Sequence, residues 1–159
     1  RLPIMSNPLK AQTRSDYAHF LSIPTRWMDN DIYGHVNNVN YYSFFDTAVN
    51  RYLIDAGALD IHNGTTVGFV VETQCQYFAP IAFPDTVHAG IRVAQLGNRS
   101  VRYEVGLFRN DDPTPAAAGH FVHVYVDRAS NQPVTIPDNA RAAMQALQQP
   151  TPLKQGAPS

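Results

Sequence analysis

Hydrophobic and polar residues alternate along four stretches in the second half of the chain, namely Val67–Phe78, Thr86–Gln95, Ser100–Arg109 and Ala117–Asp127. In the third stretch, every second position is apolar: Val101, Tyr103, Val105 and Leu107. The same alternation in the first stretch places four side chains on one face: Val71, Thr73, Cys75 and Tyr77. A period of two residues is typical of strands with one covered and one wet face, so the pattern predicts an antiparallel sheet.

The connections between these stretches are short and rich in turn residues: Pro80–Pro84, Leu96–Asn98 and Asn110–Pro113. Their lengths are those of hairpin loops. An earlier stretch, Tyr17–Arg26, has the composition of a further strand. Pro24 would confine that strand to an edge of the sheet, because proline has no N–H to donate to a neighbouring strand. The sheet is therefore expected to have about five strands.

Between the first strand and the other four, the apolar period changes to three or four residues. Apolar side chains recur from Val39 to Leu53, which predicts one long amphipathic helix. Asn37 or Asn38 can serve as its N-cap, and Gly57 lies where a helix would end. A short helix is expected after Pro137, reaching Leu147. One long helix and one short helix with an antiparallel sheet give an α+β fold class.

Composition limits the function. The chain has 159 residues and a net charge of −1, which argues against a nucleic-acid-binding protein, because such proteins usually carry a basic patch. Its single cysteine, Cys75, excludes an intrachain disulfide and a site of several thiolates. Its apolar stretches are too short to span a membrane. We expect a cytoplasmic protein with one domain over residues 17–149, a flexible lead-in over 1–16 and a flexible tail over 150–159.

The residues with the clearest chemistry lie just before the long helix. The segment Asp29-Asn30-Asp31-Ile32-Tyr33-Gly34-His35 places carboxylates and an imidazole beside the first backbone N–H groups of that helix. Those N–H groups have no partner within the helix and lie at the positive end of its dipole, so they can stabilise an oxyanion. A carboxylate beside them can attack a carbonyl carbon or activate a water molecule. The segment therefore predicts acyl transfer without a serine or cysteine nucleophile.

The run Trp27-Met-Asp-Asn-Asp-Ile-Tyr-Gly-His-Val-Asn-Asn38, followed by a tyrosine-rich helix, resembles the hot dog-fold thioesterases. The similarity is to the 4-hydroxybenzoyl-CoA thioesterase-like acyl-CoA thioesterases and covers about residues 17–148. It implies a long helix wrapped by a curved antiparallel sheet. It also implies a homodimer, with a homotetramer as the alternative, whose active sites lie at the interface between subunits. The Gly-His-Val-Asn-Asn form is more like the members that act on fatty-acyl and varied substrates.

The resemblance also implies roles for single residues. Asp31 becomes the nucleophile or general base, and the backbone N–H of Asn38, with that of Val39 next, polarises the thioester carbonyl. His35 either bonds to substrate or water or holds the loop. Gly34 permits a close turn of the backbone, and the remaining expected substrate contacts are Gly34, Asn37, Val39 and Tyr41. The substrate would be an acyl-CoA, and the chemistry needs no metal and no redox cofactor.

Several simpler or rival interpretations stand beside these roles. Asp29 is expected to brace the turn, and Asp46 on the helix to have a structural role. His120 and His123 are three apart in a strand, so they point to opposite faces and make a poor metal pair. A non-catalytic acyl-CoA-binding domain could have the same fold. An enoyl-CoA hydratase-type enzyme is disfavoured, because the family pattern places its histidine five residues after the aspartate, whereas His35 follows Asp31 by four.

Overall fold

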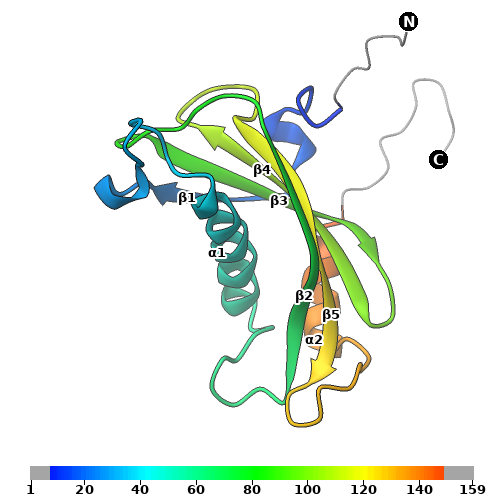
Figure 1. Ribbon diagram of the computed structural model, residues 1–159. Helices are drawn as coiled ribbons and strands as arrows, with labels where there is room; N and C mark the ends of the chain where they lie inside the picture. Colours follow the sequence, from blue (N-terminus) through cyan, green and yellow to red (C-terminus); the bar gives the residue numbers. More distant parts are fainter. Residues whose placement is uncertain (1–7, 149–159) are drawn as a thin grey trace, which may run out of the picture.

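The computed structural model describes residues 8–148, and they form one curved antiparallel sheet with a long helix lying along it (Figure 1). The strands are β1 (His19–Pro24), β2 (Thr66–Tyr77), β3 (Thr86–Leu96), β4 (Ser100–Arg109) and β5 (Ala117–Asp127). The helices are α1 (Val39–Asp55) and α2 (Asp138–Ala146), with short 3-10 turns at Arg14–Asp16 and Trp27–Asp29. The predicted α+β class and the curved sheet around one long helix are confirmed.

The strand order is β1-β3-β4-β5-β2, and every neighbouring pair is antiparallel. β1 and β2 are therefore the two edges of the sheet, and Pro24 occupies an edge as expected. The hairpins β3–β4 and β4–β5 follow the predicted turns. The segment Pro80–Pro84 does not form a hairpin, which corrects the prediction. β2 and β3 are not neighbours, because β4 and β5 lie between them in the sheet. The chain must instead cross from edge strand β2 to β3, which lies next to the opposite edge strand, β1.

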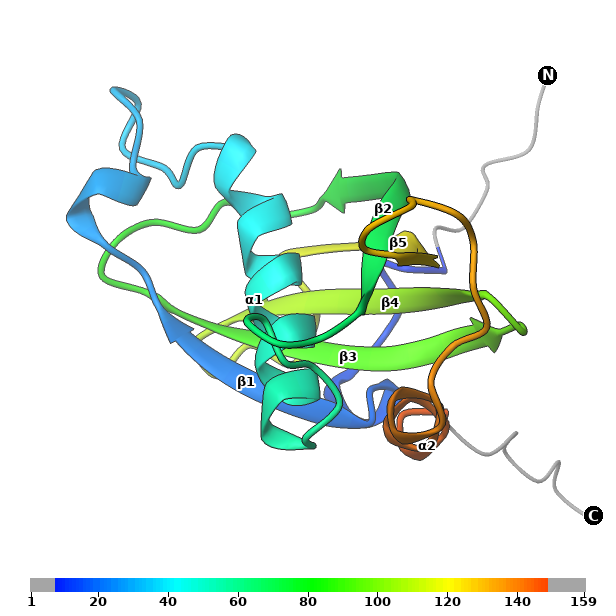
Figure 2. The ribbon, with the colours of Figure 1, turned by 90° about the horizontal axis from the view of Figure 1, so that it is seen from below.

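The main core lies between α1 and the facing side of the sheet. α1 buries one face, made of Tyr41, Phe44, Phe45, Ala48, Val49 and Leu53. The ring of Phe45 packs on Phe121 of β5, with ring centroids 5.9 Å apart, and Phe121 packs on Tyr103 of β4 at 5.6 Å. Because each fully buried large apolar side chain contributes about 1.5–3 kcal/mol, this layer holds the helix on the sheet. Figure 2 shows α1 crossing β3 and β4.

The opposite side of the sheet is covered by the start of the described chain. Tyr17 is 5% exposed, and its ring packs edge-on against Phe20 and Phe108. A Cβ atom at Gly106 would lie only 2.6 Å from the Tyr17 ring, so the absence of a side chain there makes room for the tyrosine. Arg14 lies within the expected lead-in, yet it donates hydrogen bonds to the carbonyls of Asn110 and Asp112.

Edge strand β2 differs most from its sequence pattern. The predicted covered face, which includes Val71 and Tyr77, is open in the protomer: Val71 is 55% exposed and Tyr77 is 47% exposed. A bulge between Val70 and Glu72 shifts the pairing with β5. Phe69, on the other face, is 61% exposed. The alternation predicts the strand correctly, but it does not show that this face of β2 is open in the protomer.

Candidate active site

The segment between β1 and α1 is tied at its base by Asp29, whose exposure is 3%. One carboxylate oxygen accepts the Arg26 backbone N–H at 2.7 Å, and the other accepts Nε and Nη2 of the same arginine at 3.0 and 2.7 Å. The Asp29 carbonyl accepts the Asn37 N–H at 2.8 Å and the Asn40 side-chain amide at 3.1 Å. Asp29 therefore braces the loop against the start of α1, as the sequence predicts.

The tip of this loop is a tight turn around Asp31. The Asp31 N–H donates to the His35 carbonyl at 2.8 Å, and the Gly34 N–H donates to the Asp31 carbonyl at 3.1 Å. One carboxylate oxygen of Asp31 accepts the Tyr33 N–H at 2.9 Å. Gly34 has φ +82°, a conformation that other residues adopt at a cost. Among the described residues, the second Asp31 oxygen has no hydrogen-bond partner and is free to act on a ligand.

The first turn of α1 leaves one backbone donor unused. The Asn37 side-chain oxygen accepts the Val39 N–H at 3.1 Å, so Asn37 supplies the side-chain cap. Asn38 takes the N-cap position, but its side chain makes no capping bond. Within residues 8–148, no acceptor is bonded to the Asn38 N–H. This donor lies at the positive end of the helix, where it can polarise a carbonyl oxygen.

The loop forms an open cleft of about 470 Å³, lined by Trp27, Asn30, Asp31, Ile32 and Gly34. Its rim is strongly apolar: Trp27 is 78% exposed and Ile32 is 92% exposed. The loop is anchored to the Pro80–Pro84 crossing, because the Asn30 side-chain oxygen accepts the Phe83 N–H at 3.1 Å. An exposed cluster of large apolar side chains around a carboxylate is typical of a binding surface.

The structure places the other predicted site residues in two environments. His35, Asn38 and Val39 are exposed on the same loop or at the helix start, outside the lining of the cleft. Tyr41, predicted to contact substrate, is only 4% exposed, and its ring packs on Tyr77 at 4.9 Å. The proposed contact of Tyr41 with substrate stays a prediction. Its position faces the core because residues three and four apart on α1 share the buried face.

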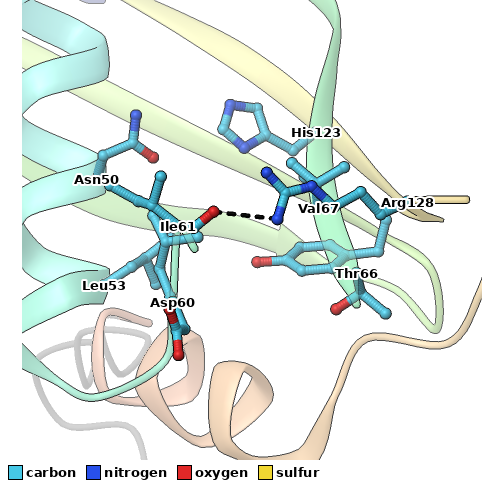
Figure 3. Close-up of a pocket in the computed structure, with 11 residues that line it drawn as sticks. Asn50, Leu53, Asp60, Ile61, Thr66, Val67, His123 and Arg128 are labelled. Atoms are coloured by element: carbon cyan, nitrogen blue, oxygen red, sulfur yellow. Dashed lines mark hydrogen bonds between the residues drawn. The ribbon is translucent and has the colours of Figure 1, made fainter. Parts of the chain in front are cut away.

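A second pocket, of about 260 Å³, lies at the other end of α1 (Figure 3). Its lining comes from α1, the following loop, the start of β2 and the end of β5: Asn50, Leu53, Leu59, Asp60, Ile61, Thr66, Val67, Gly68, His123, Tyr125 and Arg128. Burial lowers the pKa of His123 to about 4, so the ring is neutral at pH 7. This pocket was not predicted from the sequence. The signal was the alternation of His123 with Phe121 and Tyr125, which places its side chain toward α1.

The histidines of β5 do not form a metal site. His120 bonds to Glu72 at 2.6 Å on the face away from α1, whereas His123 is buried on the face toward it. The expectation that they point to opposite faces is confirmed. In the part of the chain that the structure describes, no group of three or more potential ligands could hold a metal ion.

Comparison with known proteins assigns the family. The thioesterase-like superfamily matches residues 25–144, which include the whole Asp29–Asn38 loop, all of α1 and four of the strands. The chain belongs to this superfamily. The match confirms the resemblance seen in the motif, and the enzyme is a hot dog-fold thioesterase, a hydrolase of thioesters.

Solved structures are similar over most of the chain. The PA5185 protein of Pseudomonas aeruginosa strain PAO1 is 58% identical, with a TM-score of 0.84, and the match covers 86% of this thioesterase and 95% of that protein. The PA2801 protein of Pseudomonas aeruginosa is 32% identical over 80% of this chain and 98% of that chain, with a TM-score of 0.75. A thioesterase from Thermus thermophilus, complexed with coenzyme A and Zn, is 29% identical, with a TM-score of 0.71 and coverage of 85% and 98%.

Proposed function

We propose that this thioesterase hydrolyses acyl-CoA thioesters, with fatty-acyl groups as the substrate class and Asp31 as the catalytic carboxylate. The observation that carries the proposal is a pair of unused groups at one loop: the second oxygen of Asp31 and the backbone N–H of Asn38. The Asp31 oxygen can act as a base or nucleophile, and the Asn38 N–H can donate a hydrogen bond to an oxyanion. Together these two groups are the minimum for acyl transfer. Coenzyme A in the complex of the Thermus thermophilus relative supports the choice of thiol.

Two chemical routes use the same groups. In the first, Asp31 takes a proton from water as the water oxygen bonds to the thioester carbon. The tetrahedral oxyanion is held by the Asn38 N–H, and the C–S bond then breaks to release the acid and the CoA thiolate, which takes up the proton. In the second, the Asp31 carboxylate attacks the carbon itself, expels the thiolate and forms a mixed anhydride. Water then hydrolyses the anhydride.

The remaining loop residues have supporting roles in this proposal. Gly34 lets the backbone turn closely beside the reacting carbon. Asn37 holds the first turn through its bond to the Val39 N–H, and the exposed Val39 side chain offers apolar contact to the substrate. His35, whose imidazole is exposed, bonds to substrate or to water.

We further propose a homodimer formed through edge strand β2. This edge is 12 residues long and exposes apolar side chains on both faces, including Phe69 and Val71. The other edge, β1, has six residues and ends in Pro24, which makes it a poor pairing surface. Two copies related by a two-fold axis can pair β2 with β2 in antiparallel orientation, and this pairing covers the open face. Assembly of two dimers into a tetramer is the alternative. A cytoplasmic location stays a prediction; no helix within residues 8–148 is long and apolar enough to cross a membrane.

Free-thiol release from a panel of short, medium, long and aromatic acyl-CoAs tests the function. The comparison is between the native enzyme, Asp31→Asn and the control Asp55→Asn, which removes an exposed carboxylate paired with Arg51 at the far end of α1. We expect Asp31→Asn to lower kcat by about 10²–10⁴-fold, the usual contribution of a general base. The control should retain native turnover.

Two results would overturn the proposal. Turnover by Asp31→Asn at the native rate would remove Asp31 from the chemistry. Binding of acyl-CoAs by the native protein without release of thiol from any of them would favour the non-catalytic binding domain instead. The ranking of the panel decides whether fatty-acyl groups are preferred over aromatic ones.

A further inference from the structure

The loop that carries Asp31 is not held in place by packing at its tip. Ile32 and Tyr33, which follow Asp31 in the chain, are both largely exposed. A reacting group that moves by about 1 Å can cost about 10²-fold in rate, so a catalytic carboxylate needs a fixed position. Hydrogen bonds must therefore supply what packing does not.

The loop is folded as a short two-stranded ribbon. Asn30 and Val36 form an antiparallel bridge, and the Asp31 N–H donates to the His35 carbonyl at 2.8 Å just beyond it. Asp31 therefore lies at the closed end of the ribbon, directly after Asn30. An isolated ribbon is marginally stable at best, so the position of this one depends on what it is attached to.

The ribbon is attached to the crossing between β2 and β3 on both of its sides. The Val36 N–H donates to a carbonyl of the crossing at 2.7 Å, a bond between backbones. On the other side, the Phe83 N–H donates to the side-chain oxygen of Asn30 at 3.1 Å. A ring contact between Trp27 and Phe83, with centroids 5.9 Å apart, supports this second bond. Only the second bond depends on a side chain, and that side chain is next to Asp31 (Figure 1).

The crossing is itself fixed to the sheet. Its Ile81 is fully buried in the core. The Asp85 carboxylate accepts the Ala82 N–H and the side-chain amide of Asn110, both at 3.0 Å. Asp85 directly precedes β3 and Asn110 directly follows β4, so these bonds join the crossing to the ends of two strands. Through Asn30, the loop is therefore attached to the sheet itself.

We propose that Asn30 is a positioning residue for the hydrolysis: its side-chain oxygen holds the adjacent Asp31 carboxylate within reach of the thioester carbon. The inference rests on the proposed function, in which Asp31 is the catalytic carboxylate. Loss of the bond should lower kcat, because a bound substrate would meet a displaced carboxylate. It should change KM little, because the groups that bind the substrate remain in place.

The first experiment measures the position of the loop without any thioester. Backbone hydrogen exchange of the native protein is compared with that of Asn30→Leu and Asn30→Asp by NMR. In Asn30→Leu the N–H groups of Phe83 and Asp31 should exchange about tenfold faster, the usual effect of one hydrogen bond. Asn30→Asp keeps an acceptor oxygen at the same place and should keep the native exchange. Asn30→Ala replaces Asn30→Leu if the leucine variant does not fold.

A matched control removes a similar bond far from the loop. The Asn139 side-chain amide donates to the Gly57 carbonyl at 3.1 Å, beyond the C-terminal end of α1. The Asp31 loop precedes the other end of this helix, which has 17 residues and is roughly 25 Å long. Asn139→Leu should leave the exchange of the Asp31 N–H and the native kcat unchanged. Urea denaturation of both leucine variants shows how far each lowers the free energy of unfolding.

The second experiment measures kcat and KM with the acyl-CoA that the native enzyme hydrolyses best. Asn30→Leu should lower kcat by about 10- to 100-fold with KM within about threefold of native, and Asn30→Asp should restore most of kcat. A native kcat in Asn30→Leu, beside an inactive Asp31→Asn, overturns the inference and leaves the proposed function standing. A loss confined to KM also overturns it, because Asn30 would then bind substrate. A native rate in Asp31→Asn overturns the inference and the proposed function together.

Discussion

The side-chain oxygen of Asn37 caps the backbone N–H of Val39 at 3.1 Å, and this single bond decides which donor at the start of α1 stays free. With the Val39 N–H occupied, the Asn38 N–H is the first unpaired donor of the helix. The two adjacent asparagines therefore have different tasks. Asn37 acts through its side chain, and Asn38 acts through its backbone.

Substitution of the two asparagines should separate these tasks. Asn37→Ala removes the cap and should lower the free energy of unfolding by about 0.5–2 kcal/mol, measured by urea denaturation. Asn38→Ala keeps the backbone N–H and removes a side chain with no capping bond, so its effect should stay within about 0.5 kcal/mol. Turnover should also survive Asn38→Ala. Equal destabilisation by both would contradict the assignment of the cap.

Substituting Asp29 should destabilise the fold more than substituting its partner Arg26. Asp29→Ala removes the buried carboxylate that accepts the Arg26 backbone N–H, and should cost about 1–3 kcal/mol of unfolding free energy. Arg26→Ala should cost less than Asp29→Ala, because the arginine side chain is exposed and water can replace it at the carboxylate. Chemical denaturation of the two variants gives both values. A larger loss from Arg26→Ala would mean that the ion pair, and not the backbone bond, holds the loop.

Packing of Tyr17 against Gly106 predicts a non-additive pair of substitutions. Gly106→Ala pushes a methyl group to 2.6 Å from the ring and should destabilise the fold by about 1–3 kcal/mol. In a Tyr17→Ala background the clash is gone, so the same substitution should cost much less. A double-mutant cycle measured by thermal unfolding tests this, and strictly additive effects would rule out the contact as the cause.

Burial of His123 should make stability depend on pH. Its pKa falls from 6.5 to about 4 in the fold, so between these values the unfolded chain binds a proton that the folded chain does not. The contribution of neutral His123 to the free energy of unfolding is therefore fully present above pH 6.5. It is lost as the pH falls toward 4, by up to about 3 kcal/mol. Subtracting the pH profile of His123→Phe from that of the native protein isolates the effect. A flat difference would show that the pKa of His123 is the same in the folded and unfolded chains.

A charged side chain at the middle of β2 should disrupt the proposed dimer. Val71→Lys would bring two like charges together near the two-fold axis, so we expect dissociation to monomers by analytical ultracentrifugation. Turnover should fall with it if the site needs both subunits. Ile54→Lys, an exposed apolar residue at the end of α1, is the control and should stay dimeric. A native protein that sediments as a monomer would exclude the interface.

Much of the fold follows from local pattern. The alternation at Val101, Tyr103, Val105 and Leu107 holds in β4, because that strand is central and the helix covers its inner face. The same alternation misleads in β2, since a strand at the edge shows the period whether the cover comes from its own chain or from outside it. The prediction for the Pro80–Pro84 turn is wrong for a related reason: a short connection resembles a hairpin, and only the strand order shows that it is a crossing.

The reactive loop could be predicted because its residues are adjacent in sequence. Asp29, Asp31 and Asn38 lie within ten positions, so their proximity needs no tertiary information. The pocket around His123 joins residues from 50 to 128, and only the folded sheet brings them together. The burial of Tyr41 could not be predicted from the loop motif, because it depends on which face of the helix packs on the sheet: Tyr41 projects to the buried face, whereas its neighbours Val39 and Tyr42 project to the exposed one.

The packing of Tyr17 affects how a mutational scan of this enzyme should be interpreted. Gly90 on β3 makes room for the same segment, because a Cβ atom there would lie 2.8 Å from the Phe20 ring and 2.9 Å from the Cβ of Tyr17. Two glycines on neighbouring strands, Gly90 and Gly106, therefore make room for the aromatic residues Tyr17 and Phe20. In a mutational scan these positions would tolerate little change and would resemble active-site residues, although they lie on the side of the sheet away from α1. Intolerance there would report the docking of the N-terminal segment and carry no information about catalysis.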